Sequence, residues 1–266
     1  MSITTEQIQI PTTKGAKMGA YLARPEALAR PEALARPEAL ARPGAPARAP
    51  AVMVFMEIFG VNDHIRDVTR RVAAEGYVAI APDYFHRTAP GLELAYDAKG
   101  METGIGNLMK LTADEMISDA KDTLAYLRSR PDVAGEKIGA MGFCIGGHMT
   151  YLVACETDIV AAASYYGGGI AAPQGPGGAP STLSRTSQIH GRIQCYFGGQ
   201  DRMIPLDQVD AVRAALVKAG VDHSVDVYPD ADHGFHCDQR ATYHAASAKD
   251  AWSKTLALFA QKLKSA

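Results

Sequence analysis

Hydrophobic positions along the chain follow two alternating patterns. Short runs that are apolar at nearly every position are typical of strands buried on both faces of a sheet. Between them lie longer segments in which apolar residues return every three or four positions, as in amphipathic helices. The runs that predict strands are AVMVFM (51–56), YVAIAP (77–82), KIGAMGF (137–143), IVAAASYYG (159–167), RIQCYFGG (192–199) and SVDVYP (224–229).

Helical segments follow the predicted strands in turn. We expect Asp63 to cap a helix that ends at Gly76 and whose apolar positions share one face. The other predicted helices are residues 113–129, a helix that begins at Ile145, residues 206–219 and residues 243–263. Strands and helices that alternate at this spacing predict an α/β fold, with a mostly parallel central sheet and helices on both faces.

The N-terminal part of the chain follows a different pattern. TEQIQI (5–10) and MGAYLA (18–23) alternate in a way that predicts an antiparallel pair of strands. After them the hexad LARPEA repeats. A proline in every copy prevents a continuous helix, and a period of six matches no solenoid repeat. We therefore expect residues 24–48 to form a proline-rich surface-loop insert within a single domain that spans residues 1–266.

Composition narrows the class of protein and of partner. The chain has 266 residues, of which 47% are hydrophobic and 21% charged, and its formal net charge is −2. This balance gives no reason to expect nucleic acid or an anionic membrane as a partner. The N-terminus lacks the features of a signal peptide, and no apolar run approaches a membrane span. The four dispersed cysteines favour free thiols, which are typical of a reducing compartment, so we expect a cytoplasmic protein. We expect it to be a monomer or a homodimer.

Three residues with complementary chemistry stand at or just after the carboxyl ends of predicted strands: Cys144, Asp201 and His233. Strand ends of this kind meet at one edge of a parallel sheet. The order nucleophile, acid, histidine is the order found in α/β-hydrolases. We expect His233 to take the proton of the Cys144 thiol, while Asp201 orients the imidazole and stabilises its charged form.

The turn around Cys144 has the composition that an exposed nucleophile needs. In GFCIGG (142–147) the glycines leave room for a sharp bend between strand and helix. The bend places the thiol at the start of the helix, where the N–H of Ile145 is free to stabilise an oxyanion. A buried cysteine that only fills space is the alternative that this turn alone leaves open. The matching positions of Asp201 and His233 favour catalysis.

Longer motifs extend this pattern over almost the whole chain outside the hexads. They are EIFGVNDHIRDVTRRVAAEGYVAIAPDYF (57–85), GFCIGG (142–147), YYGGG (165–169), GGQDRMIP (198–205) and DADHGFH (230–236). Together they resemble the dienelactone hydrolase family, cysteine-dependent enzymes with the α/β-hydrolase fold. The resemblance implies hydrolysis of a small lactone or ester through an acyl-enzyme, with the triad of Cys144, Asp201 and His233 and without a cofactor.

The same resemblance implies roles for four more residues. Glu57 contacts the resting thiol of Cys144 and releases it toward the histidine when substrate binds, and Ile58 provides a second oxyanion N–H. Family members that act on carboxylated dienelactone hold the carboxylate with arginines, and the candidates here are Arg87 and Arg240. Neither arginine stands at the place in the sequence where the family pattern has its substrate-binding arginine. A different or uncharged ester therefore stays open as the substrate.

Other interpretations of the same residues remain. A small-molecule binding or sensor protein could use the same pocket without chemistry. A zinc site lacks a second His/Cys pair, so we expect no metal. The residues that such a site would use are Asp232, His233, His236, Cys237 and Asp238. Residues 99–112, with two methionines and three glycines, either line or cover the pocket or form a loop packed on the protein.

Overall fold

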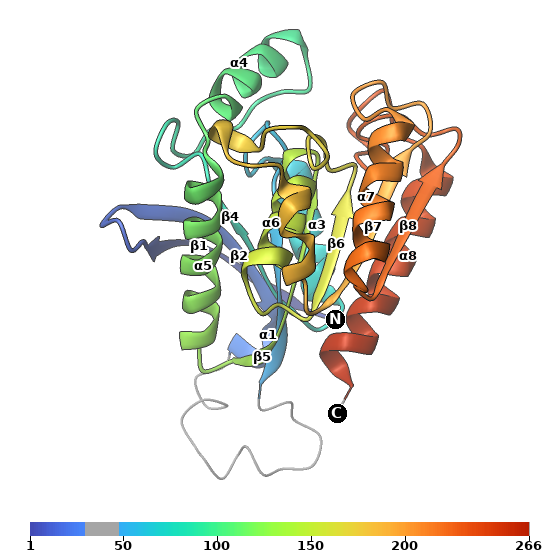
Figure 1. The fold of residues 1–266 in the computed structure, drawn as a ribbon. Helices are drawn as coiled ribbons and strands as arrows, with labels where there is room; N and C mark the ends of the chain where they lie inside the picture. Colours follow the sequence, from blue (N-terminus) through green and yellow to red (C-terminus); the bar gives the residue numbers. More distant parts are fainter. Residues whose placement is uncertain (30–47, 266) are drawn as a thin grey trace.

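Eight strands make up one mixed sheet (Figure 1). They are β1 (Ile3–Pro11), β2 (Lys17–Pro25), β3 (Ala49–Phe55), β4 (Val78–Pro82), β5 (Val133–Phe143), β6 (Ala161–Tyr165), β7 (Arg192–Gly198) and β8 (His223–Tyr228). Their order is β1-β2-β4-β3-β5-β6-β7-β8, and the computed structural model describes residues 1–29 and 48–265. Among the described strands, β2 pairs antiparallel with both β1 and β4, and every other pair of neighbours is parallel.

Helices cover both faces of this sheet, three on one face and two on the other (Figure 1). They are α5 (Ala113–Ser129), α6 (Ile145–Glu156) and α7 (Leu206–Ala219) on the near face, and α3 (Asp63–Ala74) and α8 (Ala245–Phe259) on the far face. Because both faces are covered, β4 and β6 are buried at every position. The predicted architecture, a mostly parallel sheet between helices with N-terminal antiparallel strands, is confirmed.

The first turn of α3 corrects one sequence expectation. Its N-cap is Asn62, whose side chain accepts a hydrogen bond from the N–H of Ile65 at 3.2 Å. Asp63, which we expected to cap the helix, lies inside it and forms an ion pair with Arg66 at 2.8 Å. Both residue types are good N-caps, so the hydrophobic pattern alone does not choose between neighbours.

Residues 99–112 are largely helical. Helix α4 (Ala98–Leu108) is capped by Asp97 and stands at the upper end of the molecule in Figure 1. Its glycines allow close packing, because a Cβ at Gly104 would lie 2.7 Å from the carbonyl oxygen of Ile58. The loop interpretation of this segment is therefore wrong, and α4 packs directly beside the segment that follows β3.

The proline-rich insert that we predicted over residues 24–48 lies mostly outside the described residues. At its start, Arg24 and Pro25 belong to β2, and α1 (Glu26–Ala29) adds one helical turn. Arg24 also forms an ion pair with buried Asp132 at 2.7 Å, so the predicted boundary is too early. Among the described residues, no helix is long and apolar enough to cross a membrane.

Candidate functional site

Cys144 occupies a strained turn between β5 and α6. Its φ of 57° and ψ of −121° are uncommon for a residue with a side chain. The neighbouring glycines make the turn possible. A Cβ at Gly142 would lie 2.2 Å from the carbonyl oxygen of Gly146, and one at Gly146 would lie 2.3 Å from that of Phe55. The turn therefore holds the cysteine side chain at the carboxyl edge of the sheet, at the start of α6.

Gly142→Ala tests this account of the turn. We expect the substitution to lower the free energy of unfolding by about 2 kcal/mol or more, because neither backbone at the contact can move freely. Gly106→Ala is the matched control: it lies inside α4 with no atom within 4 Å of its Cβ, and it should stabilise the helix slightly. Urea unfolding of both variants measures the difference, and equal effects would contradict the account.

Asp201 and His233 meet at the same edge, one after β7 and the other after β8. The Nδ1 atom of His233 lies 2.7 Å from Oδ2 of Asp201. The other carboxylate oxygen of Asp201 accepts hydrogen bonds from the N–H groups of Met203 and Ile204 at 2.8 and 3.2 Å. These contacts fix the orientation of the carboxylate and, through it, of the imidazole.

The second ring nitrogen of His233, Nε2, is buried and has no hydrogen-bond partner among the described residues. Burial lowers the pKa of His233, but the negative charge of the Cys144 sulfur and the hydrogen bond to Asp201 outweigh it and raise the pKa to about 10. The three residues thus form one electrostatic unit, in which the sulfur and the carboxylate both favour a protonated imidazole.

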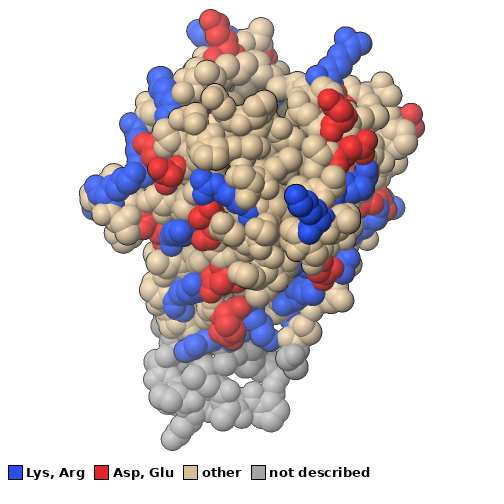
Figure 2. All heavy atoms as spheres, viewed as in Figure 1, with Lys and Arg blue, Asp and Glu red and all other residues tan. Residues whose placement is uncertain are grey.

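Cys144 and His233 open into one cavity of about 660 Å³. Its walls are mostly apolar: Leu108, Met109 and Leu111 come from the end of α4 and the segment after it, and Met203 also lines it. Among the described residues, no Lys, Arg, Asp or Glu lines it. Figure 2 shows few charged side chains on the upper part of this face, between α4 and α7. The segment 99–112 therefore lines the site with its last residues.

Glu57 is fully buried directly after β3. Its two oxygens accept hydrogen bonds from the Tyr96 hydroxyl and from Nη1 of Arg240, both at 3.0 Å. Among the described residues, no hydrogen bond joins Glu57 to the thiol of Cys144. The family resemblance implies a contact between Glu57 and the Cys144 thiol. Here each oxygen of the Glu57 carboxylate instead accepts one hydrogen bond from another side chain.

The backbone next to Glu57 and Cys144 carries two donors that face no acceptor. In the described part of the chain, neither the N–H of Ile58 nor that of Ile145 donates a hydrogen bond outside the helices and strands. Ile145 is the first residue of α6, where such N–H groups lack partners within the helix. Ile145 also lines the cavity with Cys144.

Comparison with known proteins identifies the family of this chain. The sequence profile of the dienelactone hydrolase family matches residues 37–263. The chain belongs to the dienelactone hydrolase family. A protein of Synechocystis that is provisionally named a carboxymethylenebutenolidase is 46% identical over 265 residues, which cover 99% of both chains.

Solved structures of this family and of its fold are also similar. A Klebsiella pneumoniae protein, provisionally named a dienelactone hydrolase, has a TM-score of 0.83 at 31% identity, with 98% of this chain and 100% of that chain covered. An acylaminoacyl peptidase of Pyrococcus horikoshii has a TM-score of 0.70 at 15% identity, and 43% of its chain is covered. The predicted α/β-hydrolase fold is therefore confirmed.

The two candidate arginines of this dienelactone hydrolase family member lie outside the apolar cavity. Arg87 makes a two-pronged ion pair with Asp119 of α5, with both N···O distances at 2.6 Å. Arg240 pairs with Glu57 and lies over the rings of Phe59 and Tyr96. Neither arginine lines the cavity at Cys144. Arg87 is therefore not brought to the site, and Arg240 contacts the carboxylate of Glu57 outside the cavity.

Sequence reasoning missed two tyrosines of this family member. Tyr96, the partner of Glu57, lies between β4 and α4 in a segment without regular pattern. Tyr166 has a φ of 37°, and its ring packs against the His233 ring at 5.1 Å. Tyr166 stands in the motif YYGGG, and a strained residue just after β6 is the signal that could have identified it.

The zinc site considered from sequence is not assembled. His233 is bound to Asp201, the N–H of His233 is bound to Asp232, and His236 stacks on Phe143. Cys237 lies instead near Glu57 and His64, which come from two other segments.

Proposed function

We propose that this family member hydrolyses a small uncharged ester or lactone through an acyl-enzyme on Cys144. The observation that carries the proposal is that Cys144 and His233 line the same apolar cavity, while Asp201 holds the far nitrogen of the imidazole. Family membership and the 46% identical relative support the reaction class. The four free cysteines fit a reducing compartment such as the cytoplasm.

In the acylation step, Nε2 of His233 takes the thiol proton and the sulfur attacks the acyl carbon. The N–H groups of Ile58 and Ile145 are the candidate donors to the oxyanion that forms. The tetrahedral intermediate then collapses: the carbon–oxygen bond to the alcohol breaks, and the leaving oxygen takes the proton from Nε2. In a lactone this alcohol stays attached to the acyl group.

In the deacylation step, His233 removes a proton from water, and the resulting hydroxide attacks the thioester carbon. The carbon–sulfur bond breaks, the leaving sulfur takes the proton back from Nε2, and the carboxylic acid leaves. Asp201 stabilises the imidazolium in both steps and is not itself protonated. No cofactor is needed to balance either step.

The cavity supports an uncharged substrate. Its lining contains no arginine or lysine, and both candidate arginines are already paired, Arg87 with Asp119 and Arg240 with Glu57. A carboxylate on the substrate would lose water without gaining a partner, which is unfavourable. Methionine side chains at the rim adapt to apolar groups of different shapes.

A matched pair of substrates tests this preference. We expect kcat/KM for a neutral aryl ester to exceed that for the same ester with a terminal carboxylate by about tenfold or more, because the unpaired charge must be desolvated. Steady-state kinetics measures the ratio. Arg240→Gln should change both substrates by the same factor. A loss confined to the anionic ester would show that Arg240 binds its carboxylate and would overturn the proposed substrate class.

A further inference from the structure

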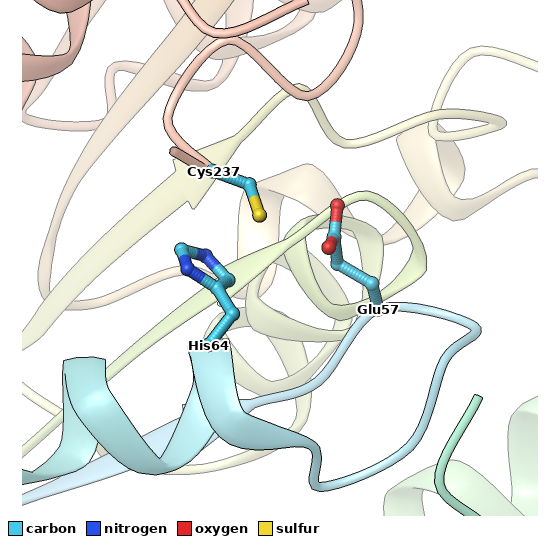
Figure 3. Close-up of side chains that lie close together, drawn as sticks. All are labelled: Glu57, His64 and Cys237. Carbon is cyan, nitrogen blue, oxygen red and sulfur yellow. The ribbon is translucent and has the colours of Figure 1, made fainter. Parts of the chain in front are cut away.

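A second cluster of reactive side chains lies outside the lining of the cavity at Cys144. Glu57, His64 and Cys237 offer one ligand atom each, and these atoms all lie within 4.8 Å of one another (Figure 3). Glu57 lies in the turn after β3, His64 lies in the first turn of α3, and Cys237 comes from the loop after β8, which is distant in sequence. All three side chains are buried and point toward a common centre.

His64 is the unexplained member of this cluster. Its residue is 3% exposed, and its Nε2 atom has no hydrogen-bond partner among the described residues. A buried polar nitrogen without a partner costs free energy, so native proteins rarely retain one. The catalytic sequence proposed for Cys144 does not use His64. The thiol of Cys237 is equally unused, although it is fully buried.

We propose that Glu57, His64 and Cys237 bind a divalent transition metal ion, with zinc as the best fit. Thiolate, imidazole and carboxylate are all zinc ligands, and the thiolate disfavours magnesium or calcium. Zinc bonds to such ligands imply ligand separations of about 3.3–3.8 Å in a tetrahedral site. The observed spread requires a contraction of about 1 Å, which side-chain rotation can supply. Water or the Tyr96 hydroxyl takes the fourth position.

The existing contacts of Glu57 are compatible with a metal ion. Each carboxylate oxygen now accepts one hydrogen bond, from Tyr96 or from Arg240, and each keeps a second lone pair. When the ion binds, Cys237 loses its proton. The exchange of one proton for a divalent ion raises the charge of the cluster by one. That charge lies close to Arg240 and opposes binding. We therefore expect Arg240→Gln to strengthen metal affinity.

Cobalt(II) titration of the Cys144→Ala protein tests the site, because that background removes the catalytic thiol as a ligand. We expect one equivalent of Co²⁺ to bind with a thiolate-to-cobalt charge-transfer band. The Cys237→Ser substitution in the same background should abolish the band, and His64→Gln should weaken binding by about 10-fold to 100-fold or more. Competition with a chromophoric chelator measures the affinities for Co²⁺ and Zn²⁺.

Matched controls separate the site from general thiol and imidazole binding. Cys155→Ala removes a buried cysteine of α6, and His190→Ala removes an exposed histidine; neither should change the affinity. Circular dichroism shows whether each variant folds, and if Cys237→Ser does not, the affinity of His64→Gln decides. The absence of the band in Cys144→Ala protein, or affinity that survives the loss of both Cys237 and His64, would overturn the proposal.

Discussion

Replacing Cys144 with alanine is expected to lower kcat/KM for an activated ester by about 10⁴-fold or more. The Cys144 sulfur lies at the β5–α6 turn, and no other cysteine and no serine, threonine, tyrosine or lysine lines the described cavity. Cys144→Ser should also be strongly impaired, because a hydroxyl gives up its proton far less readily than a thiol. Steady-state kinetics on a neutral ester measures both variants.

Mass spectrometry after a brief reaction with a slowly released ester adds a direct readout for Cys144. The wild-type protein should carry one acyl group on this residue, and Cys144→Ala should carry none. Cys195→Ala is the matched control, since this fully buried cysteine of β7 does not line the cavity. Turnover of Cys144→Ala at the wild-type rate, or wild-type protein without an adduct and without turnover, would refute the cysteine mechanism. The second result would favour a binding protein.

The positions of the three triad candidates could be predicted because each follows a strand. A buried parallel strand has a strong hydrophobic pattern, and its carboxyl end is fixed by the fold, so Cys144, Asp201 and His233 had to share one edge. The glycines of the turn were equally informative, since the contacts of Gly142 and Gly146 leave no space for a side chain.

The long charged side chains could not be placed from sequence. The family resemblance made Arg87 a candidate because it follows APDYF (81–85), but its guanidinium reaches Asp119 on α5 instead. Such a choice depends on which carboxylate packs within reach, which is a property of tertiary structure. The sequence left residues 99–112 open between a segment that lines or covers the pocket and a packed loop, whereas the structure has α4 here, with Gly104 packed against Ile58.

The cluster of Glu57, His64 and Cys237 shows the same limit for side chains that meet across segments. The search for a zinc site from sequence used local spacing and therefore considered neighbours of His233. His64 lies on α3, and only the packing of this helix against the loop after β8 brings it to Cys237. Each residue alone has no distinctive spacing, so no sequence pattern would have grouped them.

Asp201→Asn is expected to lower kcat/KM by about 10³-fold to 10⁴-fold, because the structure forces the amide into the wrong orientation. The N–H groups of Met203 and Ile204 donate to Oδ1 of Asp201, so the asparagine oxygen should take that position. Its NH₂ group then faces Nδ1 of His233, which must accept. The ring proton moves to Nε2, and His233 can no longer take the proton of Cys144.

The pKa of His233 distinguishes this cause from simple loss of structure. The charge and hydrogen bond of Asp201 help to raise that pKa to about 10, so the NMR titration of the ring should move to lower pH in Asp201→Asn. Asp232→Asn is the matched control: its Oδ1 accepts the N–H of His233 at 2.6 Å, and an amide oxygen can do the same. It should leave both activity and titration nearly unchanged. Equal losses in the two variants, or an unshifted titration in Asp201→Asn, would show that Asp201 does not act through the imidazole.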